Sequence, residues 1–138
     1  MKHLITSALV VFLLFTSSCK KEAGGGGTST IQGKVFASYY NKNFTLKAAS
    51  GFAGDIDVYI IYGDEYSFGD RTRTSYDGAY QFKYLRPGKY RVFAYSKDST
   101  GAYKNQANQF APDIAVVKPV EVTKGKETVE VPQINIIQ

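Results

Sequence analysis

The sequence has very few of the side chains on which catalysis and cross-linking most often depend. Its 138 residues include one cysteine, one histidine and no tryptophan. The cysteine is Cys19 and the histidine is His3, so both lie near the amino terminus. One cysteine excludes a disulfide within the chain and a zinc site built from several thiolates. Stability must therefore come from an ordinary packed core.

The sequence also lacks an apolar run long enough to cross a membrane. Residues 4–15 are mostly apolar, but about a dozen residues is short of the roughly 20 that a transmembrane helix needs. Lys2 precedes this segment and small residues follow it, which is the order of parts in a secretory signal peptide. We predict that residues 1–18 are a signal peptide that is removed.

The end of this segment resembles the lipobox of bacterial lipoproteins, in the residues Ser17-Ser18-Cys19. The resemblance implies cleavage before Cys19 and lipidation of this residue with a diacylglyceryl group and a further acyl chain of the palmitate type. An ordinary cleavage site that leaves a free thiol is the alternative. An unpaired thiol in a secreted chain calls for an explanation, and this favours lipidation. We therefore expect the protein to associate with the lipid bilayer through Cys19.

The residues after Cys19 indicate a tether and a location. Lys20 stands where aspartate would retain a lipoprotein at the inner membrane, so we expect an outer-membrane protein on the periplasmic face or the cell surface. Four consecutive glycines, residues 24–27, carry a high entropic cost of ordering. Residues 19–30 are accordingly predicted to form a flexible tether with a reach of roughly 15–20 Å.

Removal of the leader narrows the available chemistry. Loss of His3 leaves the mature chain without histidine, and lipidation of Cys19 blocks the only thiol. Nucleophilic machinery that needs a Ser-His or Cys-His pair is then excluded. We expect no enzyme activity and no cofactor. Of the function classes that remain, an enzyme with a glycosidase-type pair of carboxylates is the weakest candidate.

The charge of the chain does not indicate a nucleic-acid partner. There are 17 lysine and arginine residues against 12 aspartate and glutamate residues, a net charge of +5 that falls to +4 when Lys2 is removed. The basic residues are scattered and form no run of the kind that tracks a phosphate backbone. We expect no nucleic-acid binding.

From Ile31 onward the hydrophobic period is two, which is typical of half-buried strands. The pattern predicts an all-β domain over residues 31–138. Turn signals fall at Tyr76-Asp77-Gly78, Arg86-Pro87-Gly88-Lys89 and Thr123-Lys124-Gly125-Lys126. The predicted strands are residues 31–38, 56–62, 71–75, 79–83, 89–96, 116–122 and 127–136. Seven short strands at this spacing favour an antiparallel β-sandwich.

The middle of the chain resembles the carboxypeptidase regulatory-like domain. Residues 74–92, TSYDGAYQFKYLRPGKYRV, match its run of threonine, Asp-Gly, alternating aromatics, Pro-Gly and a closing Tyr-x-Val. The resemblance implies a seven-stranded, prealbumin-like Greek-key sandwich. Independently of any family, alternation puts Tyr80 with Phe82, and Tyr90 with Val92, on one face of their strands, with Leu85 at the bend between them. We interpret this cluster as core.

Two long segments, residues 39–55 and 98–115, exceed what the sandwich needs. Long loops in compact domains are often functional. Aromatic rings beside amides suit sugars, because rings stack on pyranose faces while amides bond hydroxyls. The alternative is that the aromatics anchor these loops to the sandwich. The candidate ligand-binding residues are Tyr39, Tyr40, Phe44, Tyr103, Asn105, Asn108 and Phe110.

An acidic loop over residues 63–70 suggests a metal site. Asp64, Glu65 and Asp70 could together provide oxygen ligands for calcium. The alternative is a solvated acidic turn. Their spacing lacks the pattern of an EF-hand.

Taken together, the sequence predicts a membrane-anchored, non-catalytic β-sandwich lipoprotein that acts as a binding or structural accessory module of the cell envelope. Its partners would be envelope proteins or glycan. The alternative is a glycan-binding surface lipoprotein of a polysaccharide-uptake system.

Lipidation of Cys19 predicts a specific mass. Protein extracted from membranes should begin at Cys19 and carry a diacylglyceryl group and a further acyl chain, as read by intact-mass spectrometry. The Cys19→Ser variant should lack this increment and leave the membrane fraction. A wild-type chain with an unmodified thiol would contradict the prediction.

Overall fold

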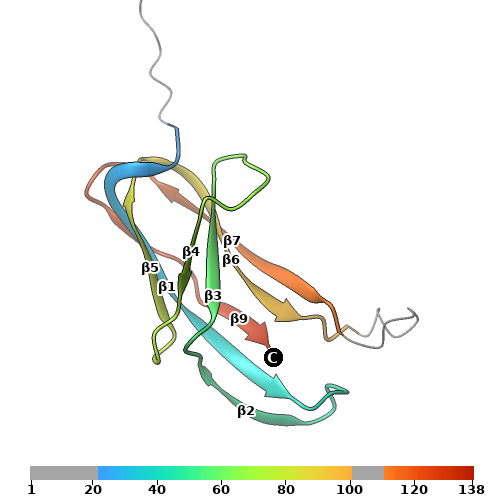
Figure 1. Cartoon of the computed structure of the whole chain (residues 1–138). Coiled ribbons are helices and arrows are strands. Elements are labelled where there is room, and N and C mark those ends of the chain that lie inside the picture. The colour runs from blue at the N-terminus through green and yellow to red at the C-terminus, as the bar shows by residue number, and fades with distance from the viewer. Residues whose placement is uncertain (1–21, 101–110) are drawn as a thin grey trace, which may run out of the picture.

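The computed structural model describes residues 22–100 and 111–138, and every regular element in these residues is a β-strand (Figure 1). None of the described residues forms a helix long and apolar enough to cross a membrane. The nine strands are β1 (Gly25–Tyr40), β2 (Lys47–Phe52), β3 (Asp57–Tyr62), β4 (Asp70–Arg73), β5 (Ala79–Leu85), β6 (Gly88–Lys97), β7 (Asp113–Val122), β8 (Thr128–Glu130) and β9 (Ile134–Ile137).

The first sheet is organised around β1, which pairs with β2, β5, β8 and β9. The backbone groups of Val35 form hydrogen bonds along one edge of β1. Its N–H donates to the Gly78 carbonyl at 2.9 Å, and its carbonyl accepts from the Ala53 N–H at 3.1 Å. Gln32 serves the opposite edge, where its carbonyl accepts from Val131 at 2.8 Å. β5 and then β2 therefore follow one edge of β1, and β8 and then β9 follow the other.

The second sheet is antiparallel throughout, in the order β4-β3-β6-β7. β3 lies between β4 and β6, so the predicted strand over residues 56–62 is central in its sheet. The two sheets pack together, which gives the all-β, sandwich-like architecture expected from the period-two pattern.

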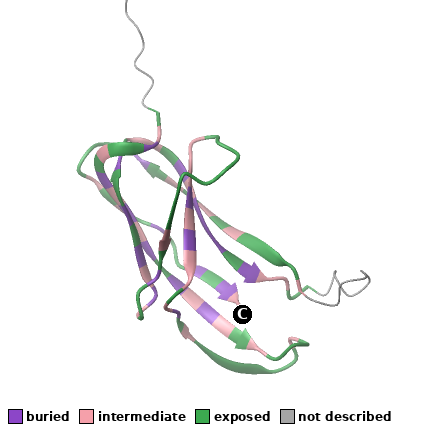
Figure 2. Cartoon of the chain, viewed as in Figure 1, coloured by how far each residue is buried: buried purple, intermediate pink, exposed green. Residues whose placement is uncertain are grey.

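The core lies between the sheets and is apolar. Figure 2 shows buried and more exposed residues alternating along the strands, as a sheet with one face covered requires. The predicted aromatic cluster belongs to this core, since Tyr80, Phe82, Leu85, Tyr90 and Val92 are all at most 4% exposed. The core also contains Ala94 of β6 and, from other strands, Ile31, Val35, Ala37, Val58, Ile60, Val122, Ile134 and Ile136.

The predicted tether is wrong over residues 25–30, because β1 begins at Gly25. The glycines are ordered by close backbone approach: a side chain on Gly27 would lie 2.0 Å from the carbonyl oxygen of Leu85. Just before the strand, the Gly24 N–H donates to the Tyr90 hydroxyl at 2.9 Å and its carbonyl accepts from Arg86 at 2.9 Å. Here glycine permits close contact with a neighbouring strand, and the free energy of that packing offsets the conformational entropy that the glycine backbone loses.

The segment 39–55 is not a long loop. β1 runs on to Tyr40 and pairs with β2 in an antiparallel hairpin. Asn41 closes the turn, because its side-chain oxygen accepts from the N–H of Thr45 at 2.9 Å. In the second predicted loop, β7 begins at Asp113 rather than at residue 116, and residues 101–110 lie outside the described part of the chain.

The carboxy-terminal prediction of one antiparallel strand over residues 127–136 is also wrong. The segment forms two strands, β8 and β9, separated around Pro132, and both run parallel to β1. The turn before β8 leads from the second sheet to the first and is not a hairpin. The Glu127 carboxylate accepts the N–H groups of Thr123 at 2.8 Å and Lys124 at 3.2 Å, and these bonds lower its pKa.

The other two turns also join different sheets. At residues 76–78 the N–H of Ser75 donates to Ala79 at 2.9 Å, so the chain turns tightly as predicted. Nevertheless β4 and β5, on either side of this turn, belong to different sheets, as do β5 and β6. Nine strands with two parallel pairings replace the seven antiparallel strands that the sequence predicts.

The core position of Phe82 generates a stability prediction. Phe82→Ala should lower the free energy of unfolding by about 3–5 kcal/mol, because it removes a buried ring and leaves a cavity. Chemical denaturation measures this change. Lys83→Ala, an exposed neighbour on the same strand, is the control and should change stability by less than about 0.5 kcal/mol. Equal effects of the two changes would contradict the assignment.

Candidate functional site

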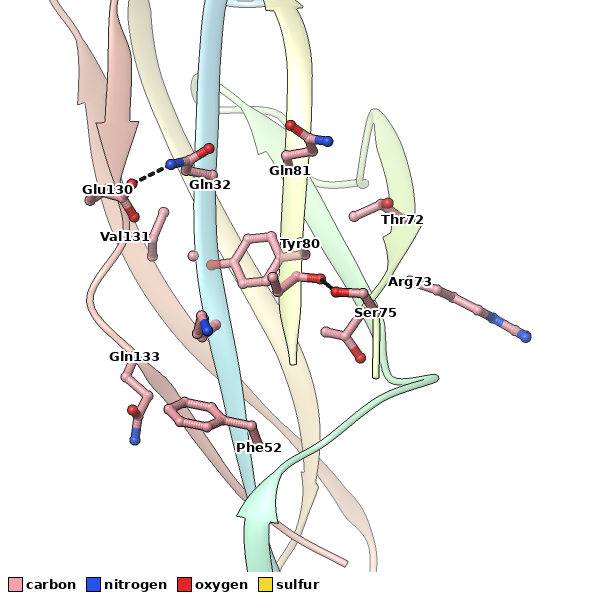
Figure 3. Close-up of a pocket in the computed structure, with 14 residues that line it drawn as sticks. Gln32, Phe52, Thr72, Arg73, Ser75, Tyr80, Gln81, Glu130, Val131 and Gln133 are labelled. Atoms are coloured by element: carbon pink, nitrogen blue, oxygen red, sulfur yellow. Dashed lines mark hydrogen bonds between the residues drawn. The ribbon is translucent and has the colours of Figure 1, made fainter. Parts of the chain in front are cut away.

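A groove of about 740 Å³ is bounded by the first sheet and by β4 (Figure 3). Its polar side chains come from strands that are far apart in the sequence. Those that matter most below are Gln32, Lys34, Phe52, Gln81, Glu130 and Gln133. A volume of this size is within the range of roughly 300–1,000 Å³ that is usual for small-ligand sites.

Three polar side chains form a row across β5, β1 and β8. On β1, Gln32 alternates with buried Ile31 and therefore points away from the core. Gln32 is the register partner of Gln81 on β5 and of Glu130 on β8. Directly opposed residues project from the same face of a sheet, so the row is a direct product of strand register.

The row keeps unused hydrogen-bonding capacity. The Gln32 amide donates to the Glu130 carboxylate, which engages one group on each side chain. Within residues 22–100 and 111–138, the Gln81 side chain makes no hydrogen bond. Gln133 donates to Asn135 at 2.7 Å, which leaves its carbonyl oxygen available. Each amide can both donate and accept, so the groove suits ligands that carry hydroxyl or amide groups.

Phe52 provides the apolar part of the groove. Its ring contacts Phe36 edge-on at 5.6 Å, and 49% of the residue remains exposed. The Lys34 ammonium lies 4.9 Å from the Phe52 ring centroid and 3.4 Å from the Asp77 carboxylate. Lys34 is therefore already engaged by an aromatic ring and by a carboxylate.

Tyr80 is next to Gln81 on β5, but its side chain projects to the opposite, core face of the sheet. Figure 3 shows its ring extending across β1 at Gly33, where a side chain would lie 2.6 Å from the Tyr80 oxygen. The hydroxyl is buried and has no hydrogen-bond partner in the part of the chain that the structure describes. Burial, and secondarily the charge of Glu130, raise the pKa of Tyr80 well above its ordinary value. The hydroxyl is therefore a neutral donor and acceptor over the whole physiological pH range.

Three of the predicted ligand-binding residues are described, and they do not line this groove. Tyr39, Tyr40 and Phe44 lie at the turn between β1 and β2, where the Tyr40 and Phe44 rings are 6.3 Å apart. These two rings therefore contact each other within the turn. The remaining predicted residues, Tyr103, Asn105, Asn108 and Phe110, lie outside the described residues.

The structure does not bring the acidic side chains of the loop between β3 and β4 together with one another. Among the described residues, no three acidic side chains, with Asp64, Glu65 and Asp70 included, are grouped closely enough to hold a metal ion. Arg91 instead fixes this loop by donating to the Glu65 carbonyl at 2.6 Å. The calcium prediction has no support from the geometry.

A second feature, not predicted as a cluster, is a group of four aromatic side chains on the second sheet. Tyr59 stacks on Phe93 with ring centroids 5.0 Å apart, and it meets Phe68 at 4.9 Å and Tyr95 at 5.6 Å. These rings are absent from the central core between the sheets. The signal available in the sequence was the near-continuous apolar run over residues 56–62, which is typical of a strand buried on both faces.

Comparisons with known proteins identify no family for this chain. No family model matches it, and no curated protein matches it. The likeness to the carboxypeptidase regulatory-like domain therefore stays a prediction.

Two tyrosine substitutions should have opposite effects on stability. Tyr80→Phe removes a buried hydroxyl that lacks a protein partner, so the free energy of unfolding should rise by about 1 kcal/mol. Tyr90→Phe should lower it by about 1–3 kcal/mol. The Tyr90 hydroxyl donates to Arg86 at 2.6 Å and accepts from Gly24, so its loss leaves both backbone groups unpaired. Denaturant unfolding measures both changes. A loss of stability in Tyr80→Phe would show that its hydroxyl is hydrogen-bonded.

Proposed function

We propose that the protein is a membrane-anchored, non-catalytic β-sandwich lipoprotein that acts as a binding or structural accessory module of the cell envelope. The leader and Cys19 support the anchor. The groove across the first sheet supports the binding role, because it offers amides, a carboxylate and an exposed ring. The observation that carries the proposal is that Gly24 is hydrogen-bonded to the sandwich, because this limits how far the sandwich can lie from the lipid anchor at Cys19.

The attachment shortens the tether. The backbone is held from Gly24 onward, so only residues 20–23 connect it to Cys19. Five peptide steps span at most about 18 Å when fully extended. An accessory module with so short a connection would stay next to the bilayer surface and would sample few orientations.

The length of β1 gives the anchored module a direction. Its 16 residues extend roughly 50 Å from the anchored end toward the hairpin with β2. Figure 1 shows the amino-terminal segment and this hairpin at opposite ends of the fold. The groove lies along the side, where a partner in the periplasm or outside the cell could reach it. An outer-membrane location is part of this proposal.

The carboxypeptidase regulatory-like family and its prealbumin-like Greek-key fold also belong to the proposal. In support, Tyr80, Phe82, Leu85, Tyr90 and Val92 from the motif are all core residues. A departure from the expected pattern is the pairing of β8 and β9 parallel to β1. Members of that family usually support other machinery and do not catalyse, and this favours an accessory role.

A second candidate function is glycan binding at the cell surface within a polysaccharide-uptake system. The specific observation in its favour is that the row of Gln81, Gln32 and Glu130 lies in the same groove as the exposed ring of Phe52. Amides and aromatic rings together are well matched to the hydroxyls and apolar faces of sugars.

Tether length provides the test of the accessory role. Insertion of ten glycine and serine residues after Lys21 should leave the melting temperature unchanged but reduce the recovery of cross-linked envelope partners severalfold, because the module is no longer held at the surface. Proteins captured from intact cells are compared by quantitative mass spectrometry. An insertion of ten residues at the Asn41–Leu46 turn is the control, because it leaves the tether length unchanged. Unchanged capture by the long-tether variant would contradict the proposal.

A further inference from the structure

We propose that the groove on the first sheet binds a short, uncharged oligosaccharide. One or two sugar rings would bond the row of Gln81, Gln32 and Glu130, and an apolar ring face would pack on Phe52. The inference rests on the proposed binding function, and it narrows the glycan of the second candidate function to a short, uncharged one. It differs from the sequence prediction, in which the loop aromatics held the sugar.

Hydrogen-bonding capacity is the first argument. Neighbouring strands are about 4.8 Å apart, so the row on β5, β1 and β8 spans roughly 10 Å, comparable to two linked sugar rings. Gln81 has no side-chain partner in the described chain, and Gln32 uses one amide hydrogen on Glu130. The row therefore keeps both donors and acceptors free. Sugar hydroxyls, which both donate and accept, match such an arrangement.

Charge is the second argument, and it selects an uncharged ligand. The described cations that line the groove are Lys34 and Arg73. Lys34 is paired with Asp77 at 3.4 Å, and Arg73 is paired with Asp55 at 2.9 Å and with Asp57 at 3.0 Å. A carboxylated or sulfated sugar would have to displace these pairs and would also approach Glu130. Neutral sugars avoid both costs.

The test uses the full-length lipidated protein in detergent micelles. It is first applied to an array of neutral and acidic oligosaccharides, and the neutral oligosaccharide that gives the strongest signal is then titrated by calorimetry. Wild-type protein should bind neutral members in preference to acidic ones. Gln81→Ala should weaken binding about tenfold, the equivalent of one lost hydrogen bond of about 1.4 kcal/mol. Phe52→Ala should weaken binding by a similar factor with an unchanged melting temperature.

Two control variants locate the site. Lys83→Ala changes another exposed residue of β5 that does not line the groove, and it should leave the affinity unchanged. Tyr39→Ala changes the site predicted from the sequence, and it too should bind normally. Binding of acidic sugars only, absence of binding to any neutral sugar, or loss confined to Tyr39→Ala would each overturn the inference. None of these outcomes affects the tether experiment, so failure of the sugar site is distinguishable from failure of the accessory role.

Discussion

The fold depends on one strand that is paired along both of its edges. Among the described strands of the first sheet, β2, β5, β8 and β9 are all joined through β1. A strand presents alternate residues to its two edges, so sixteen residues are enough to hold two partners in succession on each side. The same alternation sends Ile31 and Val35 into the core and Gln32 toward the groove. Stability and the candidate site thus derive from one repeated geometry.

Local patterns predicted the faces of the strands well. The inward positions of β1 and the core cluster of Tyr80, Phe82 and Tyr90 follow from period-two alternation, which is a property of each strand alone. Features that depend on a distant partner were missed. The sequence predicts that Gly27 is flexible, because its close contact with Leu85 has no local signal. It predicts β8 as part of a hairpin, because its parallel pairing with β1 has none either.

The candidate site shows the same division. Alternation predicts that Gln32, Gln81 and Glu130 each face outward, but only the register of three strands makes them neighbours. The aromatic residues Tyr39 and Phe44 were predicted to bind a ligand because such residues are concentrated in one stretch of sequence. Dispersed amides carry no such local signal. A binding surface on a sheet face is therefore harder to recognise from sequence than one on a loop.

The course of β1 also has a mechanical consequence. In a chain anchored through Cys19, a force away from the bilayer would enter the fold at Gly24 and act along the axis of β1. The hydrogen bonds to β5 and β8 lie across that axis, so they would be loaded together in shear rather than opened one after another. Tyr90 and Arg86 would take the first load, since they hold Gly24. The glycine segment that the sequence predicts to be a flexible tether would then be the part of the fold that first bears a force pulling the protein from the membrane.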